Sequence, residues 1–198
     1  MTPRRSLRRP IGQRPYRKMF IVSVEGRRTE PGYFAVLKDS TSIIHIHCLP
    51  ASHQSAPASV LKRMNRHLRA EALRPGDEAW LVVDRDQWTE AQLEELQAWT
   101  TQSAQHGLAL SNPKFEFWLL LHFEDGVGAT SERTCESRLR RHLPHYDKGI
   151  HRADFPPERI DQAIARAKKR DHPPCIDWPR DFGVTTVYRL VERIRKAG

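Results

Sequence analysis

The chain has 198 residues, of which 38% are hydrophobic and 29% are charged, and its formal net charge is +9. That length can bury one substantial core, and its longest hydrophobic runs are far too short to cross a bilayer. We therefore expect one folded domain with a small appendage and no membrane partner. The basic N-terminus lacks the apolar segment of a signal peptide, and three widely spaced cysteines favour a reducing, cytoplasmic location over a disulfide framework.

The positive charge is concentrated at the N-terminus. Residues 1–18 contain seven basic and no acidic residues, whereas the other 180 residues carry 26 basic and 24 acidic ones. With three prolines among them, these residues are typical of an arm that is disordered when free. Such an arm either contacts the phosphates of DNA or RNA or acts as a solubilising tail. The candidate phosphate contacts are Arg4, Arg5, Arg8, Arg9, Arg14, Arg17 and Lys18, joined by Arg27 and Arg28 in the body of the chain.

The first predicted element is a strand that ends on a carboxylate. Residues 20–24 are mostly hydrophobic and β-branched, and Glu25 and Gly26 follow them. Gly26 allows a tight turn, and the Thr-Glu-Pro triplet at 29–31 predicts a helix start with Thr29 as its N-cap. Glu25 is then either a ligand-binding acid at the carboxyl end of a parallel strand or a solvated residue of a surface turn.

Strand and helix patterns then alternate along the chain. Further strands are predicted at 43–48, 78–84 and 107–111, and helices at 31–38, 60–73, 89–102 and 114–122, with Thr89 as the cap of the third of these helices. This alternation predicts an α/β fold with a mainly parallel sheet of four strands flanked by helices. Only helical patterns follow, at 132–143, 157–169 and 184–196, with an irregular stretch at 171–183. The predicted division is an arm at 1–18, an α/β core at 19–125 and a helical extension at 126–198 that packs on the core.

A second predicted strand also ends on acidic residues. Asp84 ends the strand at 78–84, and Asp86 follows two residues later, so both side chains can face one site. Glu25 joins them if the two strands are neighbours in the sheet. Three carboxylates this close repel one another by on the order of 1 kcal/mol per pair in water, and more near a protein surface. A hard cation such as Mg²⁺ or Mn²⁺ would neutralise them.

Two further acidic residues have roles that the sequence leaves open. Glu116 stands among aromatic residues at the start of a helix, where an unpaired charge is unfavourable. It is either a further acid of the metal site, a clamp on a catalytic loop, or the ion-pair partner of an arginine. Glu30 is either a metal ligand or an acid that interacts favourably with the positive end of its helix.

Other motifs do not support a different kind of site. His45 and His47 lack the additional Cys or His residues of a zinc site, and no nucleophile triad has local support. The chain contains no phosphate-binding loop of the ATPase type. Any ATP-dependent step must therefore come from another chain.

Several short motifs carry a family resemblance. In chain order they are Val24-Glu25-Gly26, Thr29-Glu30-Pro31, Tyr33-Phe34, Val83-Asp84-Arg85-Asp86, Ser111-Asn112-Pro113, Phe115-Glu116, Trp118 to Phe123, Tyr146-Asp147-Lys148, Thr186-Val187-Tyr188 and Leu190-Val191-Glu192. In this order they resemble the RloB-like family, over roughly residues 19–196. Lys114 departs from the family pattern, in which a small or apolar residue, often Cys, is expected.

The resemblance implies a Toprim-type core, as in primases, topoisomerases and overcoming-lysogenization-defect nucleases, and a role in bacterial anti-phage defence beside an ABC- or SMC-type ATPase. In one interpretation the protein is a nuclease: Asp84 and Asp86 hold the cation, Glu25 is a ligand or acid–base group, and Lys148 neutralises transition-state charge. In the other it is a non-catalytic adaptor that binds nucleic acid or the ATPase. The retained acids favour the nuclease, because clustered like charges are unfavourable unless they are used.

Overall fold

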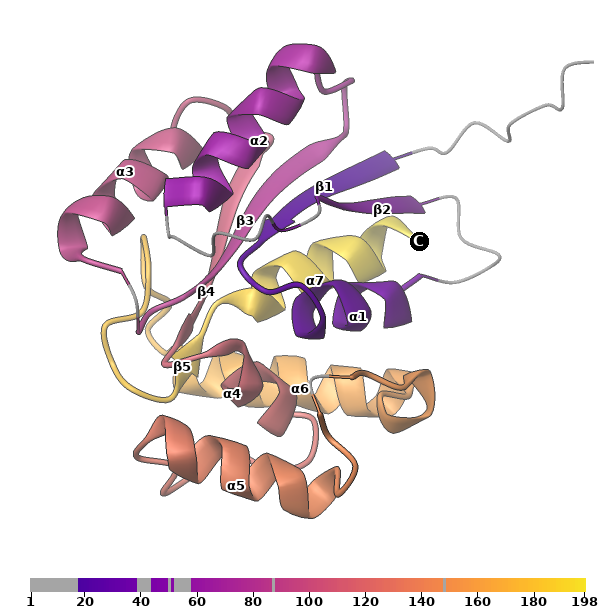
Figure 1. The fold of residues 1–198 in the computed structure, drawn as a ribbon, viewed down its shortest axis with the longest axis vertical. Helices are drawn as coiled ribbons and strands as arrows, with labels where there is room; N and C mark the ends of the chain where they lie inside the picture. The colour runs from indigo at the N-terminus through magenta and orange to yellow at the C-terminus, as the bar shows by residue number, and fades with distance from the viewer. Residues whose placement is uncertain (1–17, 39–43, 50, 52–57, 87, 148) are drawn as a thin grey trace, which may run out of the picture.

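Four parallel strands and one short antiparallel strand form a single sheet in the order β2-β1-β3-β4-β5 (Figure 1). The parallel strands are β1 (Lys18–Val24), β2 (Ile44–Leu49), β3 (Glu78–Asp84) and β4 (His106–Asn112), and β5 (Val184–Thr185) is antiparallel to β4. This computed structural model describes residues 18–38, 44–49, 51, 58–86, 88–147 and 149–198. The predicted arm up to residue 17, Ile43, most of the loop that follows β2, and Lys148 lie outside the described residues.

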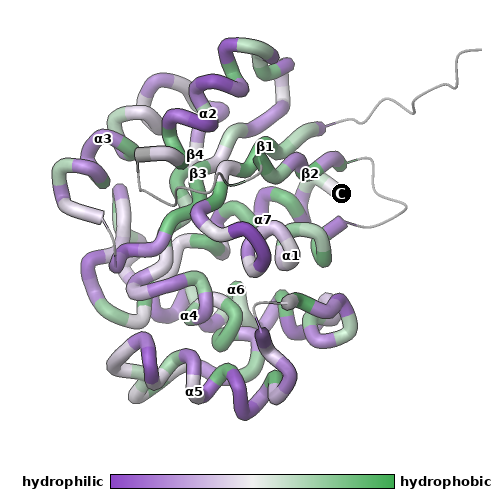
Figure 2. Tube along the Cα trace, viewed as in Figure 1, coloured by the Kyte–Doolittle hydropathy of each residue, from purple (hydrophilic) through white to green (hydrophobic). Residues whose placement is uncertain are grey.

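The central strands are hydrophobic on both sides because helices cover both faces of the sheet (Figure 2). Side chains alternate along β1: Phe20 and Val22 join the hydrophobic cluster on one face, whereas Met19 and Ile21 join the cluster on the other. The same alternation along β3 completes the two layers. The continuous hydrophobic runs in the sequence therefore reflect strands that are buried from both directions.

The seven α-helices of the described chain are divided between the two faces (Figure 1). On one face lie α2 (Ala58–Ala70) and α3 (Glu90–Thr100). On the other lie α1 (Thr29–Val36) and α7 (Val187–Ala197), with α4 (Phe115–Leu120), α5 (Glu132–His142) and α6 (Pro157–Arg170) packed beyond them, and a short 3₁₀ turn at Arg152–Asp154. None of the helices that the structure describes is long and apolar enough to cross a membrane.

The chain builds the sheet outward from β1 in both directions. From β1 the chain passes through α1 to β2 on one side, and then returns through α2 to β3 on the other side. The helices α1 and α2 lie on opposite faces of the sheet, so the strand order has a topological switch point between β1 and β3 at its carboxyl edge (Figure 1). Open α/β sheets bind their ligands at such switch points.

The predicted α/β class and the mainly parallel sheet are confirmed, but the sheet has five strands instead of the four predicted. The fifth strand, β5, occupies the start of a stretch that the sequence predicted as helix. It is only two residues long, so no periodicity reveals it. Its position is set by tertiary contacts: the Thr185 hydroxyl bonds to that of Ser111 (2.8 Å), and Thr186 Oγ1 accepts from the Leu110 N–H (2.9 Å).

The two predicted helix caps have different outcomes. Thr89 caps α3 as expected, and its side chain and that of Gln92 form a reciprocal capping box. The prediction for Thr29 is wrong: Arg28 occupies the N-cap position of α1 and makes no capping bond. Thr29 is instead buried in the first turn, where its hydroxyl lies 3.4 Å from the Tyr146 hydroxyl. This distant tyrosine was not visible in the local pattern.

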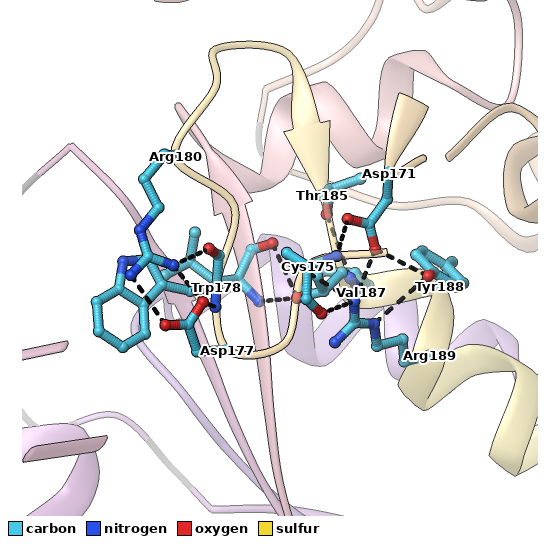
Figure 3. Close-up of polar contacts among 11 residues, drawn as sticks. Asp171, Cys175, Asp177, Trp178, Arg180, Thr185, Val187, Tyr188 and Arg189 are labelled. Carbon is cyan, nitrogen blue, oxygen red and sulfur yellow. Dashed lines mark hydrogen bonds and ion pairs between the residues drawn. The ribbon is translucent and has the colours of Figure 1, made fainter. Parts of the chain in front are cut away.

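The irregular stretch between α6 and β5 is held by polar contacts (Figure 3). The buried Asp171 carboxylate accepts from the Cys175 N–H (2.9 Å), the Tyr188 hydroxyl (2.9 Å) and Arg189 (2.7 Å). Further along, Arg180 pairs with Asp177 and stacks over the Trp178 ring. The stretch also reaches β4, because the Asn112 side chain donates to the Arg180 carbonyl (2.8 Å). Side chains thus replace secondary structure along this segment.

Candidate functional site

Glu25 and Asp84 meet at the carboxyl edge of the sheet because β1 and β3 are neighbours. The Asp84 N–H donates to Glu25 Oε1 at 3.3 Å, and the Trp88 indole N–H donates to the same oxygen. Trp88 is buried between β3 and α3 and therefore fixes the direction of the Glu25 side chain. The two strand-end acids that the sequence singled out are thus brought side by side.

The Asp84 carboxylate is tied to the start of α4. Its Oδ1 accepts the Phe115 N–H at 2.8 Å. Burial raises its pKa well above the ordinary value, and the negative charges of Glu25, Glu30, Glu116 and Asp86 raise it further. All five acids proposed from the sequence therefore lie close enough to influence one position.

The pKa of Glu25 is raised by the same two causes, burial and neighbouring negative charges. Burial raises its pKa from 4.5 to about 7, and Glu30 and Asp86 add to the increase. The hydrogen bonds from Trp88 and from the Asp84 N–H oppose it but do not cancel it. At neutral pH this carboxyl group therefore exchanges a proton readily, as a general acid–base group does.

Glu30 closes the turn between β1 and α1. It is buried in the first turn of α1, and its Oε1 accepts the Gly26 N–H at 2.8 Å. A side chain at Gly26 would collide with the Glu30 carboxylate. Gly26 is therefore required for this close approach, and Glu30 holds the backbone beside Glu25 in place.

Glu116 is buried in the first turn of α4, and the Tyr146 hydroxyl donates to it at 3.1 Å. Burial raises the pKa of Tyr146, and the charge of Glu116 raises it further, so this hydroxyl keeps its proton. The sequence offered an ion-pair partner for Glu116, and the structure adds a tyrosine that the sequence did not suggest. Tyr146 also lies next to Thr29, so it connects the starts of α1 and α4.

Asp86 has a cationic partner. Lys114 Nζ lies 3.2 Å from its carboxylate and 2.7 Å from that of Glu132, at the start of α5. Hydrogen bonding to Glu132 and to Asp86 raises the pKa of Lys114, which keeps it charged. The residue that departs from the family pattern thus compensates one acid of the site.

The predicted phosphate contacts are placed at different ends of β1. Arg27 and Arg28 are exposed in the turn after Glu25, and Arg28 lies 3.7 Å from Asp147. Lys18 begins β1 at the opposite edge of the sheet and pairs with Glu78 at 2.6 Å. Lys148 and the six arginines of the arm lie outside the part of the chain that the structure describes.

Sequence reasoning missed three residues that shape the site: Trp88, Lys114 as a charge partner, and Arg63. Arg63 reaches from α2 to the end of β1, where it donates to the Val24 carbonyl and to Ser23 Oγ (3.1 Å). Trp88 could have been noticed, since it follows Asp86 by two residues. Arg63 had no local signal, because its partners are about 40 positions away.

The donors at this edge suit a hard cation in kind. Among the described residues, no group of three or more His, Cys, Asp and Glu side chains is arranged to hold a metal ion. Glu25 and Asp84 nevertheless each keep one carboxylate oxygen that accepts no hydrogen bond from a described residue. Mg²⁺ typically binds one or two carboxylates and keeps several waters or substrate oxygens. This pair therefore fits such an ion.

Comparison with known proteins gives one result. A family model described as RloB-like protein matches residues 20–194, nearly the whole chain. No curated protein and no solved structure matches the sequence. The matched range includes β1 from Phe20 onward, all of β3 and all five acids described above. The chain therefore belongs to the RloB-like protein family.

Proposed function

We propose that this protein is a Mg²⁺- or Mn²⁺-dependent nuclease with a Toprim-type core. The observation that carries the proposal is the pairing of Glu25 with Asp84 at the switch point of the sheet, with both pKa values raised by burial and by neighbouring acids. Such a pair is stabilised by a proton or by a cation. A site that favours cations, located where α/β sheets bind ligands, suits chemistry on a phosphodiester.

Each acid has a distinct part in the proposed reaction. When bound, the cation would polarise the phosphate and stabilise the leaving oxygen. Glu25 and Asp84 would hold it through their free oxygens, and Glu25, with a pKa of about 7, can take a proton from the attacking water. Glu30 and Glu116 position the backbone turns through Gly26 and Tyr146. Asp86, compensated by Lys114, supports the negative field, and Lys148 would neutralise charge in the transition state.

The biological setting is part of the same proposal. Resemblance to Toprim-containing relatives supports a role in bacterial anti-phage defence, on DNA or RNA, beside an ABC- or SMC-type ATPase. One observation favours the alternative of a non-catalytic adaptor: Asp86 pairs with Lys114, so the three strand-end acids are not all free to bind a cation. The adaptor would use the same fold to bind nucleic acid or the ATPase.

Replacing Asp84 by Asn distinguishes the proposed nuclease from the non-catalytic adaptor. Without metal, we expect Asp84→Asn to raise the melting temperature slightly, because one repelling charge is removed while the amide oxygen still accepts the Phe115 N–H. With millimolar Mn²⁺ we expect the wild type, but not the variant, to gain stability. Thermal melts with and without Mn²⁺ measure both effects, and cleavage of labelled DNA and RNA with the partner ATPase follows.

A matched control is Glu94→Gln, which removes an exposed charge from α3 away from the acids. It should respond to Mn²⁺ as the wild type does. The nuclease proposal fails if the wild type gains no stability from Mn²⁺ and Asp84→Asn supports defence as well as the wild type. A metal response that Asp84→Asn and Glu94→Gln both retain would place the cation elsewhere.

A further inference from the structure

A surface groove is lined by residues of α2 and α3. These two helices cover the face of the sheet away from α1 and α7 (Figure 1). Its volume is about 640 Å³. Leu61 and Leu96 line its floor, and Trp88 lines one part of its wall. The groove is separate from the acidic site, although the two share Trp88.

One wall of the groove is a row of positive charges. Lys62, Arg66 and Arg69 line it from α2, at positions four and three residues apart, so they follow one stripe of the helix. All three are exposed, and none forms an ion pair with a described residue. At 1.5 Å per residue the row is about 10 Å long, and a duplex strand carries about three phosphates over that distance.

Within the described part of the chain, the facing wall carries a single negative charge. From α3 the groove receives Gln92 and Glu95, and Glu95 is the only acid among the described residues that line it. The arrangement therefore attracts a flexible anion with repeated charges more than it attracts a single acidic group. Three uncompensated cations on one stripe also have no structural role that the described contacts reveal.

The groove leads to the acids. Both α2 and α3 follow strands of a parallel sheet and run back along them, so their N-termini lie at the carboxyl edge. At that end Trp88, in the wall of the groove, donates to Glu25, and Arg63 of α2 contacts the Val24 carbonyl one residue before Glu25. An anionic chain lying along α2 would therefore extend toward Glu25 and Asp84.

We propose that the groove between α2 and α3 binds the phosphate backbone of the nucleic acid, with Lys62, Arg66 and Arg69 as the contacts. This inference rests on the proposed function for the class of substrate. It assigns the path by which a nucleic-acid strand reaches Glu25 and Asp84. It also places nucleic-acid binding on the folded body in addition to the N-terminal arm. DNA and RNA share the phosphate chemistry, so the test compares both.

The test is a binding measurement in EDTA, so that cleavage does not contribute. The full chain and a triple variant, Lys62→Gln with Arg66→Gln and Arg69→Gln, are titrated against labelled mixed-sequence single strands of DNA and RNA and a DNA duplex. Over about 50 to 200 mM salt, we expect the triple variant to bind at least about tenfold more weakly, with a salt slope reduced by about 2 to 3. The matched control, Arg133→Gln with Arg141→Gln and Lys169→Gln, removes the same charge from exposed positions on α5 and α6 and should stay within about twofold of the wild type.

A second pair of variants tests the opposite sign. Glu95→Gln removes the acid from the groove and should tighten binding about twofold, whereas Glu94→Gln, on the same helix outside the groove, should not. Both are single changes at exposed positions of α3, so this pair keeps the test decisive if the triple variant does not fold.

Several results would overturn the assignment: equal losses in both triple variants, no change in the groove variant, no binding of DNA or RNA by the wild type, or equal competition by poly-glutamate. The two proposals are separable. If groove-dependent binding is present but Mn²⁺ has no effect and Asp84→Asn supports defence as well as the wild type, the groove is supported and the nuclease fails. A Mn²⁺ response lost in Asp84→Asn without groove-dependent binding gives the reverse result.

Discussion

At the scale of single residues, the carboxylates of the acidic site differ in whether they have a cationic partner. Asp86 has Lys114, whereas the hydrogen bonds that Glu25 and Asp84 accept within the described part of the chain come from neutral N–H groups of Trp88, Asp84 and Phe115. Neutral donors only partly offset the burial of a carboxylate, so the pKa of both acids stays high. The site is therefore built to favour a bound proton or cation at one pair of oxygens.

Glu25 should make stability depend on pH in a defined direction. Its pKa is about 7 in the folded protein and 4.5 ordinarily, so between these values the folded state retains a proton that the unfolded state has lost. The free energy of unfolding should therefore fall as pH rises from about 4.5 to 7, by on the order of 2 kcal/mol. Glu25→Gln, which can still accept from Trp88, should show a smaller decline, and the part that remains comes from Asp84, whose pKa is also raised.

Urea unfolding in EDTA at pH 5 and pH 8 measures the difference between the two proteins. Glu94→Gln, an exposed acid, should keep the wild-type dependence. Parallel stability curves for the wild type and Glu25→Gln would show that Glu25 titrates normally and that the acids do not perturb one another.

At the scale of elements, α3 connects the acidic site to the groove. It begins directly after Trp88, and Thr89 caps it by accepting the Gln92 N–H (3.3 Å), while the Gln92 side chain accepts the Thr89 N–H (2.9 Å). The cap therefore fixes the point at which the chain leaves the acids and enters the helix.

Thr89→Ala should lower the free energy of unfolding by about 1 kcal/mol, because one helix N–H loses its acceptor. The comparison is Thr101→Ala at the other end of α3, where the exposed hydroxyl only donates to the Ala98 carbonyl, and the cost should be below about 0.5 kcal/mol. Chemical denaturation gives both values. Equal costs at the two ends would mean that the capping box contributes nothing specific.

Elements with a strong local pattern were predictable, and those set by distant contacts were not. Strand β3 has the predicted limits, and α3 has its predicted cap, because hydrophobic runs and turn residues determine them locally. The pairing of Glu25 with Asp84 followed from one further assumption, that β1 and β3 are neighbours. By contrast, β5, the burial of Thr29, and the Lys114 contact with Asp86 depend on partners far along the chain.

At the scale of the whole molecule, the positive charge is distributed over two regions. Residues 1–17 contain six of the arginines, and the row on α2 supplies three further exposed cations. If both contact phosphates, their contributions to binding are roughly additive in the logarithm of the salt concentration. A single strand could then contact the arm and the groove together.

Deleting residues 1–17 should weaken nucleic-acid binding and reduce its salt slope, while leaving the melting temperature nearly unchanged. The reason is that these residues carry charge outside the predicted hydrophobic pattern. Titrations of the full and shortened chains at several salt concentrations measure the slope. An unchanged slope would show that the arm does not touch phosphate, and a large fall in melting temperature would show that it packs on the fold.

Lys114 links two parts of the molecule that are distant in the sequence. Its ammonium group is shared between Asp86, beside the sheet edge, and Glu132, the first residue of α5. Any force that draws α5 away changes how that one charge is divided, and so changes the electric field at Glu25 and Asp84 without touching either residue. The outer helices thus have an electrostatic connection to the acids, and a chain that grips α5 could adjust their proton affinity from outside.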